Sequence, residues 1–306
     1  MNFTLTLVNV LIMMAYAVPG FILVKCRAVK GESISAFAKV LLFVCQPCLS
    51  LYSFNKADYT AELFADMCIF FGISLLLQAI VLTVLFFIFR IKYSDAGYRV
   101  ATAACVFGNV GFLGVPLLEA LLPQYPDAIA FSAMYILSMN LLSWTVGSAI
   151  LTGDKKYVSV KKALLTPPIL TLIVALPLFF TCTKLPSVID GSVALLGKMT
   201  TPLCMLIMGM RLALAPARQL FNDWKIYFSA IVKLAVFPLA GLLIATVIPV
   251  SEYVRTTLFI LSCCPTASVV LNLAEMYGQG QQNAANAVLT CTIFSALTIP
   301  IMLLII

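Results

Sequence analysis

The chain has 306 residues, of which 62% are hydrophobic and only 10% are charged, and its mean hydropathy is +1.08. Soluble domains carry about 25% charged residues, so this composition excludes a soluble protein and indicates an integral membrane protein with little mass outside the bilayer. The net charge of +7 does not indicate a nucleic-acid partner, because the basic residues follow the expected membrane topology. The chain has no histidine, which excludes the usual zinc sites, Ser-His hydrolases and histidine proton relays.

Apolar stretches long enough to cross a bilayer recur along the whole chain. A crossing needs roughly 20 apolar residues, and the sequence predicts ten transmembrane helices. In chain order they cover residues 4–24, 34–54, 64–89, 98–121, 127–151, 163–183, 187–213, 225–249, 253–278 and 283–305. The first has no basic residue before it and several after it, which indicates an uncleaved helix and not a signal peptide.

Lys and Arg concentrate in the connections that follow the first, third, fifth and seventh crossings. Examples are Lys25, Arg90, Lys161 and Arg211. Because cytoplasmic connections are enriched in these residues, we expect both termini on the extracytoplasmic side.

The fourth crossing contains residues that interrupt a helix. Gly108, Gly111 and Gly114 permit unusual backbone angles and close helix approach, and Pro116 removes a backbone donor. Tight helix packing alone would explain the glycines, but Asn109, a lone amide deep in the span, favours a break. Broken backbone is tolerated in a membrane only where it is buried in protein or lines a cavity.

The ninth crossing has a corresponding break at Pro265, where Thr266 and Ser268 are placed to cap the helix that follows. A pair of interrupted segments in two halves is typical of a secondary transporter's binding site. Helix N-termini there would bind an anion, so we expect the backbone amides around Gly111 and Ala267 to meet a carboxylate.

The two halves of the chain carry matching landmarks. Gln46-Pro47 in the second crossing has a counterpart in Thr201-Pro202 of the seventh, and the two breaks follow at similar distances. With an odd number of crossings in each half, the second copy is inserted upside down. We therefore expect two inverted five-helix repeats, residues 1–152 and 163–306, joined by a short cytoplasmic connection at 153–162.

Other polar residues inside the predicted spans are further candidates for the site. Gln46, Asn140 and Asn272 are either substrate ligands or hydrogen bonds between helices. Lys198 and Lys233 each cost about 2.5–3.5 kcal/mol at a membrane centre. Either they attract an anionic substrate, or they pair with an acidic side chain such as Asp66 or extend to the interface.

These segments resemble the auxin efflux carrier family, which includes plant auxin exporters and bacterial malate-permease-like carriers. The resemblance covers nearly the whole chain and is carried by residues 109–117, 166–168, 202–203, 208–213, 265–268 and 274–278. The short central connection and the Cys264-Pro265-Thr266 sequence differ from the plant exporters and favour the bacterial branch.

The resemblance implies an all-α membrane fold like that of the bile-acid/sodium symporters, with helices 4 and 9 broken and crossing. It also implies a scaffold of crossings one, two, six and seven that forms a homodimer, and alternating access of the elevator type. The location would be the bacterial cytoplasmic membrane.

We therefore expect a secondary transporter of small organic anions, either mono- or dicarboxylates such as malate or malonate, or an auxin-like aromatic acid. The alternatives are a sodium-coupled symporter of a larger amphipathic anion and a uniporting, channel-like pore. No enzyme motif is present, no cofactor or metal is expected, and a coupling ion, H⁺ or Na⁺, is left open. The expected partners are the substrate and the lipid bilayer, without nucleic acid.

Overall fold

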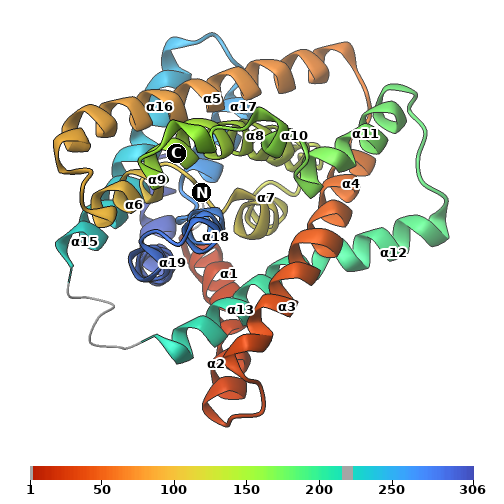
Figure 1. Cartoon of the computed structure of the whole chain (residues 1–306). Coiled ribbons are helices and arrows are strands. Elements are labelled where there is room, and N and C mark those ends of the chain that lie inside the picture. The colour runs from red at the N-terminus through yellow and green to blue at the C-terminus, as the bar shows by residue number, and fades with distance from the viewer. Residues whose placement is uncertain (1–2, 216–222) are drawn as a thin grey trace.

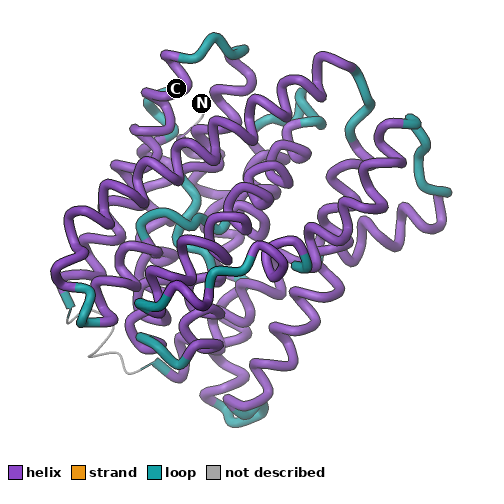
Figure 2. Tube along the Cα trace, turned by 45° about the horizontal axis from the view of Figure 1, so that its top comes forward, coloured by secondary structure: helices purple, strands orange, loops and turns teal. Residues whose placement is uncertain are grey.

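The computed structural model describes residues 3–215 and 223–306, and the described elements are helices. Figure 1 shows their arrangement, and Figure 2 shows that helix makes up most of the described chain. The helices are α1 (Phe3–Ala15), α2 (Ala17–Lys25), α3 (Ile34–Val40), α4 (Gln46–Lys56), α5 (Ala61–Phe89), α6 (Ala96–Ala104), α7 (Val115–Leu121), α8 (Ala128–Leu142), α9 (Ser148–Thr152), α10 (Val160–Leu164), α11 (Pro167–Phe180), α12 (Ser187–Lys198), α13 (Thr200–Leu214), α15 (Trp224–Ile231), α16 (Phe237–Val247), α17 (Glu252–Ser262), α18 (Ser268–Tyr277) and α19 (Gln281–Met302). Single π-helical turns cover Leu41–Cys45, Val110–Gly114, Ser143–Gly147 and Val232–Val236.

Seven helical segments within the described residues are long and apolar enough to cross a membrane. They are Phe3–Lys25, Gly31–Lys56, Ala61–Lys92, Ala128–Thr152, Ser187–Leu214, Trp224–Val247 and Gln281–Met302. Each corresponds to one of the crossings expected from the sequence.

The other three expected crossings are shorter or interrupted. In the segment 163–183 the helix α11 starts only at Pro167. A proline disfavours the helical conformation at the residue before it, and Thr166 is accordingly extended. The segments 98–121 and 253–278 leave the helical conformation between α6 and α7 and between α17 and α18. The predicted interruptions are therefore confirmed.

Polar side chains fix where several helices begin. Thr60, Asp95, Asp223 and Ser251 each accept a hydrogen bond from a backbone amide in the first turn of the helix that follows. Such caps satisfy amide groups that lack a partner inside the helix. Asp95 and Ser251 cap α6 and α17, the two helices that lead into the central breaks.

The helices pack in two groups (Figure 1). In one group α2 packs on α13, and α4 packs on α11 and α12; in the other, α5 packs on α8, α16 on α17, and α19 on α15, α18 and α6. The chain termini are marked near each other in both views, and α1 packs against α19.

Two glycines allow α2 and α13 to touch through their backbones. A Cβ atom at Gly20 would collide with the carbonyl oxygen of Leu206, and one at Gly209 would collide with that of Ala17. Small residues at helix contacts allow such close approach in membrane proteins. The contact holds the first and seventh predicted crossings together.

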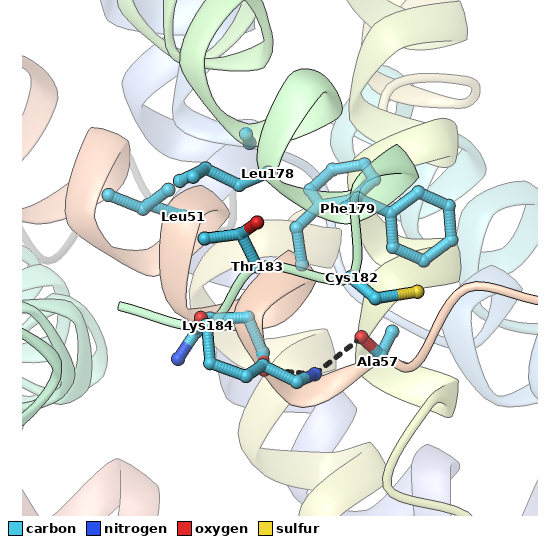
Figure 3. A pocket seen from close by; sticks show the side chains of 10 residues that line it. Leu51, Ala57, Leu178, Phe179, Cys182, Thr183 and Lys184 are labelled. Carbon is cyan, nitrogen blue, oxygen red and sulfur yellow. Dashed lines mark hydrogen bonds between the residues drawn. The ribbon is translucent and has the colours of Figure 1, made fainter. Parts of the chain in front are cut away.

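The connection between α11 and α12 is tied to the end of α4 by Lys184, which Figure 3 shows beside Ala57. Its ammonium donates to the carbonyl oxygens of Ala57 at 2.8 Å and Asn55 at 2.9 Å, and it lies 2.7 Å from the Asp58 carboxylate. The pocket beside it has a volume of only about 10 Å³. That is room for about one water molecule, so this pocket is a packing feature and not a substrate site.

Candidate functional site

The two breaks meet and pair with each other. The backbone amide of Asn109 donates to the carbonyl of Pro265 at 2.7 Å, and the amide of Ala267 donates to that of Phe107 at 2.8 Å. Gly108 and Thr266 form an isolated antiparallel bridge. Two short extended segments thus satisfy each other's buried polar groups, which allows broken backbone deep inside the molecule.

Thr266 has a different role from the one that the sequence predicts. Its hydroxyl donates to the carbonyl oxygen of Ala104, the last residue of α6, at 2.8 Å. The residue at the N-cap of α18 is Ala267, and no side chain caps this helix. The prediction that Thr266 and Ser268 cap α18 is therefore wrong, because the antiparallel bridge directs Thr266 towards the other broken helix.

The glycines of the fourth crossing provide close approach and not unusual backbone angles. Within the described residues the glycines with positive φ are at other positions. A Cβ at Gly108 would lie 3.0 Å from the Lys233 ammonium, one at Gly111 would lie 3.0 Å from Ile136, and one at Gly114 would lie 2.7 Å from Leu261. The expectation of close packing holds, and that of special backbone angles does not.

A cavity of about 510 Å³ opens against the paired breaks. Most of its wall is apolar and includes Phe43, Phe112, Ile136, Met139 and Trp144. Seven of the residues predicted for the site line it: Gln46, Gly108, Asn109, Gly111, Asn140, Ser268 and Asn272.

Asn109 and Asn140 illustrate how these side chains are held. Asn109 is only 4% exposed, and its side chain lies against the Cys204 thiol of α13. Asn140 donates to the Thr166 hydroxyl at the start of α11 at 3.4 Å. Both amides therefore stand where α6–α7 and α8 face helices of the other packing group.

Four residues at the start of two helical segments line this cavity, and their backbone amides have no backbone acceptor in the described part of the chain. They are Gly111 and Phe112, after the first break, and Ser268 and Val269, after the second. The predicted amide of Ala267 is not among them, because it donates to Phe107. Free amides at a helix N-terminus provide donors and a partial positive charge for an anion.

The remaining predicted residues lie elsewhere. Pro116 is the second residue of α7, after the π-helical turn, and with Lys198 it lines a second cavity of about 410 Å³. Gly114, Pro265 and Thr266 are buried behind the first cavity. The Thr201 hydroxyl, on the wall of the second cavity, donates at 2.6 Å to the carbonyl oxygen of Phe112, which lines the first cavity.

Lys233 lines neither cavity. Its side chain is fully buried, its ammonium donates to the carbonyl oxygen of Ser262 at 3.1 Å, and it lies 3.8 Å from the centre of the Phe237 ring. Within residues 3–215 and 223–306 it forms no ion pair, so the predicted pairing with an acid such as Asp66 is not observed.

Two contacts join the half-helices that follow the breaks to the other packing group. Tyr52 of α4 donates to Glu119 of α7 at 2.9 Å, beside the second cavity. Arg211 of α13 forms a 2.6 Å ion pair with Glu275 of α18. They connect α7 to α4 and α18 to α13.

Several cavity residues were missed from the sequence, notably Phe43, Trp144 and Lys162. Lys162 is the charged residue on the cavity wall within the described chain, and its ammonium lies 5.7 Å from the Tyr277 ring. In the sequence, Lys162 looks like the other basic residues of a cytoplasmic connection, so no local pattern indicates that it lines the cavity. Phe43 and Trp144 lie in π-helical turns, which often occur at functional sites but have no clear sequence pattern.

Residues 3–303 match a family model described as "Membrane transport protein". A comparison with curated proteins found no significant match.

Proposed function

This chain belongs to the membrane transport protein family, that of the auxin efflux carriers, and from this premise we propose that it is a secondary transporter of organic anions. It is a multi-pass membrane protein. The observation that carries the proposal is the cavity of about 510 Å³ that ends at two paired helix breaks. Such breaks near the middle of a membrane are typical of transporter binding sites.

The full architecture in this proposal is a fold of ten crossings in two inverted repeats, residues 1–152 and 163–306, joined by 153–162. The seven long spans, the shorter α11 and the two interrupted segments supply the ten crossings. The antiparallel pairing of the breaks is what a two-fold relation between the repeats would produce.

Transport would proceed by an elevator movement of one packing group past the other. The division of contacts between α2, α4 and α11–α13 on one side and α5, α8 and α15–α19 on the other supports this. The first group would be the scaffold and the homodimer contact. The location would be a bacterial cytoplasmic membrane with both termini extracytoplasmic.

The substrate carboxylate would bind at the free amides of Gly111, Phe112, Ser268 and Val269. Asn109 would bind substrate at the first break, with Gln46, Asn140 and Asn272 as further polar contacts around the same cavity. Lys162, at the wall of the cavity, would add long-range attraction for an anion.

The chemistry of the wall favours one substrate class. Phe43, Phe112 and Trp144 form an apolar surface, while one ammonium group is present on the wall within the described residues. A dicarboxylate such as malate would place its second charge against this surface, and burying a charge without a partner is costly. An aromatic or aliphatic monocarboxylate of the auxin-like type fits better than malate or malonate.

The test is uptake and charge movement in proteoliposomes, with a panel of aromatic monocarboxylates, aliphatic monocarboxylates and dicarboxylates. Na⁺ and H⁺ gradients are imposed separately, which distinguishes coupled transport from uniport. Saturable uptake of monocarboxylates supports the proposal, and uptake that favours malate or malonate contradicts the substrate class. Failure of the whole panel, with folded protein, would overturn the assignment to organic anions.

A further inference from the structure

Lys233 is a buried cation whose role the substrate cavity does not explain. It has no exposed surface and lines neither cavity. A lysine at a membrane centre costs about 2.5–3.5 kcal/mol on insertion scales. It therefore needs a compensating interaction, and its neighbours include the Phe237 ring and the buried thiols of Cys105, Cys263, Cys264 and Cys291.

The compensating negative charge comes from a helix end. Lys233 donates to the carbonyl oxygen of Ser262, which is the last residue of α17. The C-terminus of a helix carries a partial charge of about −0.5 from carbonyls without intrahelical donors. The Lys233 ammonium thus lies at the negative end that the second break creates.

The first break creates a second negative end of the same kind, and a neutral group satisfies it. The last carbonyl of α6, that of Ala104, accepts from the Thr266 hydroxyl. The two broken helices are therefore closed differently, one by a hydroxyl and one by an ammonium group.

The Lys233 ammonium also lies close to the place where the two breaks pair. A Cβ at Gly108 would lie 3.0 Å from Lys233 Nζ and 3.2 Å from its Cε, so the lysine occupies the space that this glycine leaves. Lys233 stands in the π-helical turn Val232–Val236, which separates α15 from α16. Both the glycine and the turn place a positive charge beside the bridge of Gly108 and Thr266.

We propose that Lys233 is a resident cation of the paired breaks. Its ammonium takes the place that a bound alkali cation would hold at the carbonyl end of α17. In transporters with discontinuous helices, carbonyl ends of half-helices coordinate Na⁺. Here the tethered ammonium neutralises that end without a bound ion. The paired breaks are therefore stable without Na⁺, and transport by the proposed carrier needs no Na⁺ at this position.

The first test is the thermal stability of the purified protein in detergent, at constant ionic strength, in sodium, potassium, ethylammonium or choline chloride. The variants are Lys233→Ala, which vacates the site, and Lys233→Gln, which keeps a donor but removes the charge. The control is Lys198→Ala, which removes an exposed intramembrane lysine on the second cavity. This measurement requires no substrate, so its outcome does not depend on the proposed function.

The Tm of the wild type should not differ among the four salts, and the same should hold for the Tm of Lys198→Ala. Lys233→Ala should lose roughly 5 °C in choline, and sodium or ethylammonium should restore part of the loss. Lys233→Gln should also melt below the wild type, because a neutral amide does not balance the helix end. If Lys233→Ala does not fold, Lys233→Gln decides the matter.

A Lys233→Gln variant as stable as the wild type would overturn the proposal, as would a folded Lys233→Ala variant that responds alike to all four salts. A wild-type Tm that rises specifically in sodium would also contradict it. Uptake by the wild type in sodium-free proteoliposomes is the functional counterpart, and a strict requirement for Na⁺ would count against the resident cation.

Discussion

Replacing Thr266 by valine removes one hydrogen bond and keeps nearly the same shape. The hydroxyl, on a side chain only 1% exposed, donates to the buried carbonyl of Ala104 at 2.8 Å. An unsatisfied buried acceptor costs about 1–3 kcal/mol in soluble proteins, but interhelical hydrogen bonds in membrane proteins average about 0.6 kcal/mol. We expect a loss of about 1 kcal/mol, which lowers Tm by roughly 2–4 °C in a chain of this size.

The assay is thermal unfolding of purified protein, followed by intrinsic fluorescence. Thr266→Ser keeps the hydroxyl and should stay closer to the wild type than Thr266→Val. Ser268→Ala is the matched control, because no side chain caps α18 and removing this hydroxyl should leave Tm unchanged. Equal Tm values for Thr266→Val and the wild type would refute the claim that Thr266 closes the end of α6. A loss in Ser268→Ala would restore the capping role.

Three further predictions address other parts of the molecule. Gly209→Ala should lower Tm by roughly 2–10 °C, because the new methyl group meets the Ala17 backbone. Gly72→Ala, where the added Cβ would lie in open space, should not lower it, and equal losses would contradict the close α2–α13 contact. Lys162→Gln should raise the apparent KM for the anion by roughly 2- to 5-fold without changing Tm, whereas Lys161→Gln should change neither. The pKa of Asp95 is lowered, first by a hydrogen bond from Lys225 and also by the Gly97 amide, so Asp95 stabilises the fold above its unfolded pKa of about 4 and this contribution disappears as the pH falls through the lower folded value. Tm measured from pH 5 to pH 2 should therefore fall less steeply in Asp95→Asn, and parallel curves would contradict this.

The helical segments could be predicted because each depends on local composition. Apolar length located the seven long spans, and Pro265 and the glycines around Asn109 located the two breaks. The signals are strong because a polar or helix-breaking residue inside lipid must have a specific partner. For the same reason, most of the amide side chains chosen as candidates line one cavity.

What could not be predicted depends on which groups pair across the two breaks. Ala267 was expected to offer its amide to the substrate, but that amide donates to Phe107, a residue far away in the sequence. Thr266 turns to Ala104 for the same reason. Phe43, Trp144 and Lys233 lie in π-helical turns, which have no characteristic amino-acid composition. The sequence therefore could not show on which face of the helix these side chains lie.

Substrate uptake by the Asn109→Ala variant tests the central claim most directly. Asn109 lines the cavity at the first break, and its backbone amide pairs with Pro265 whatever the side chain is. The account predicts that monocarboxylate uptake into proteoliposomes is lost, while the yield of folded protein and its Tm stay close to those of the wild type. Uptake at the wild-type rate from this variant would contradict the assignment of the cavity as the transport site.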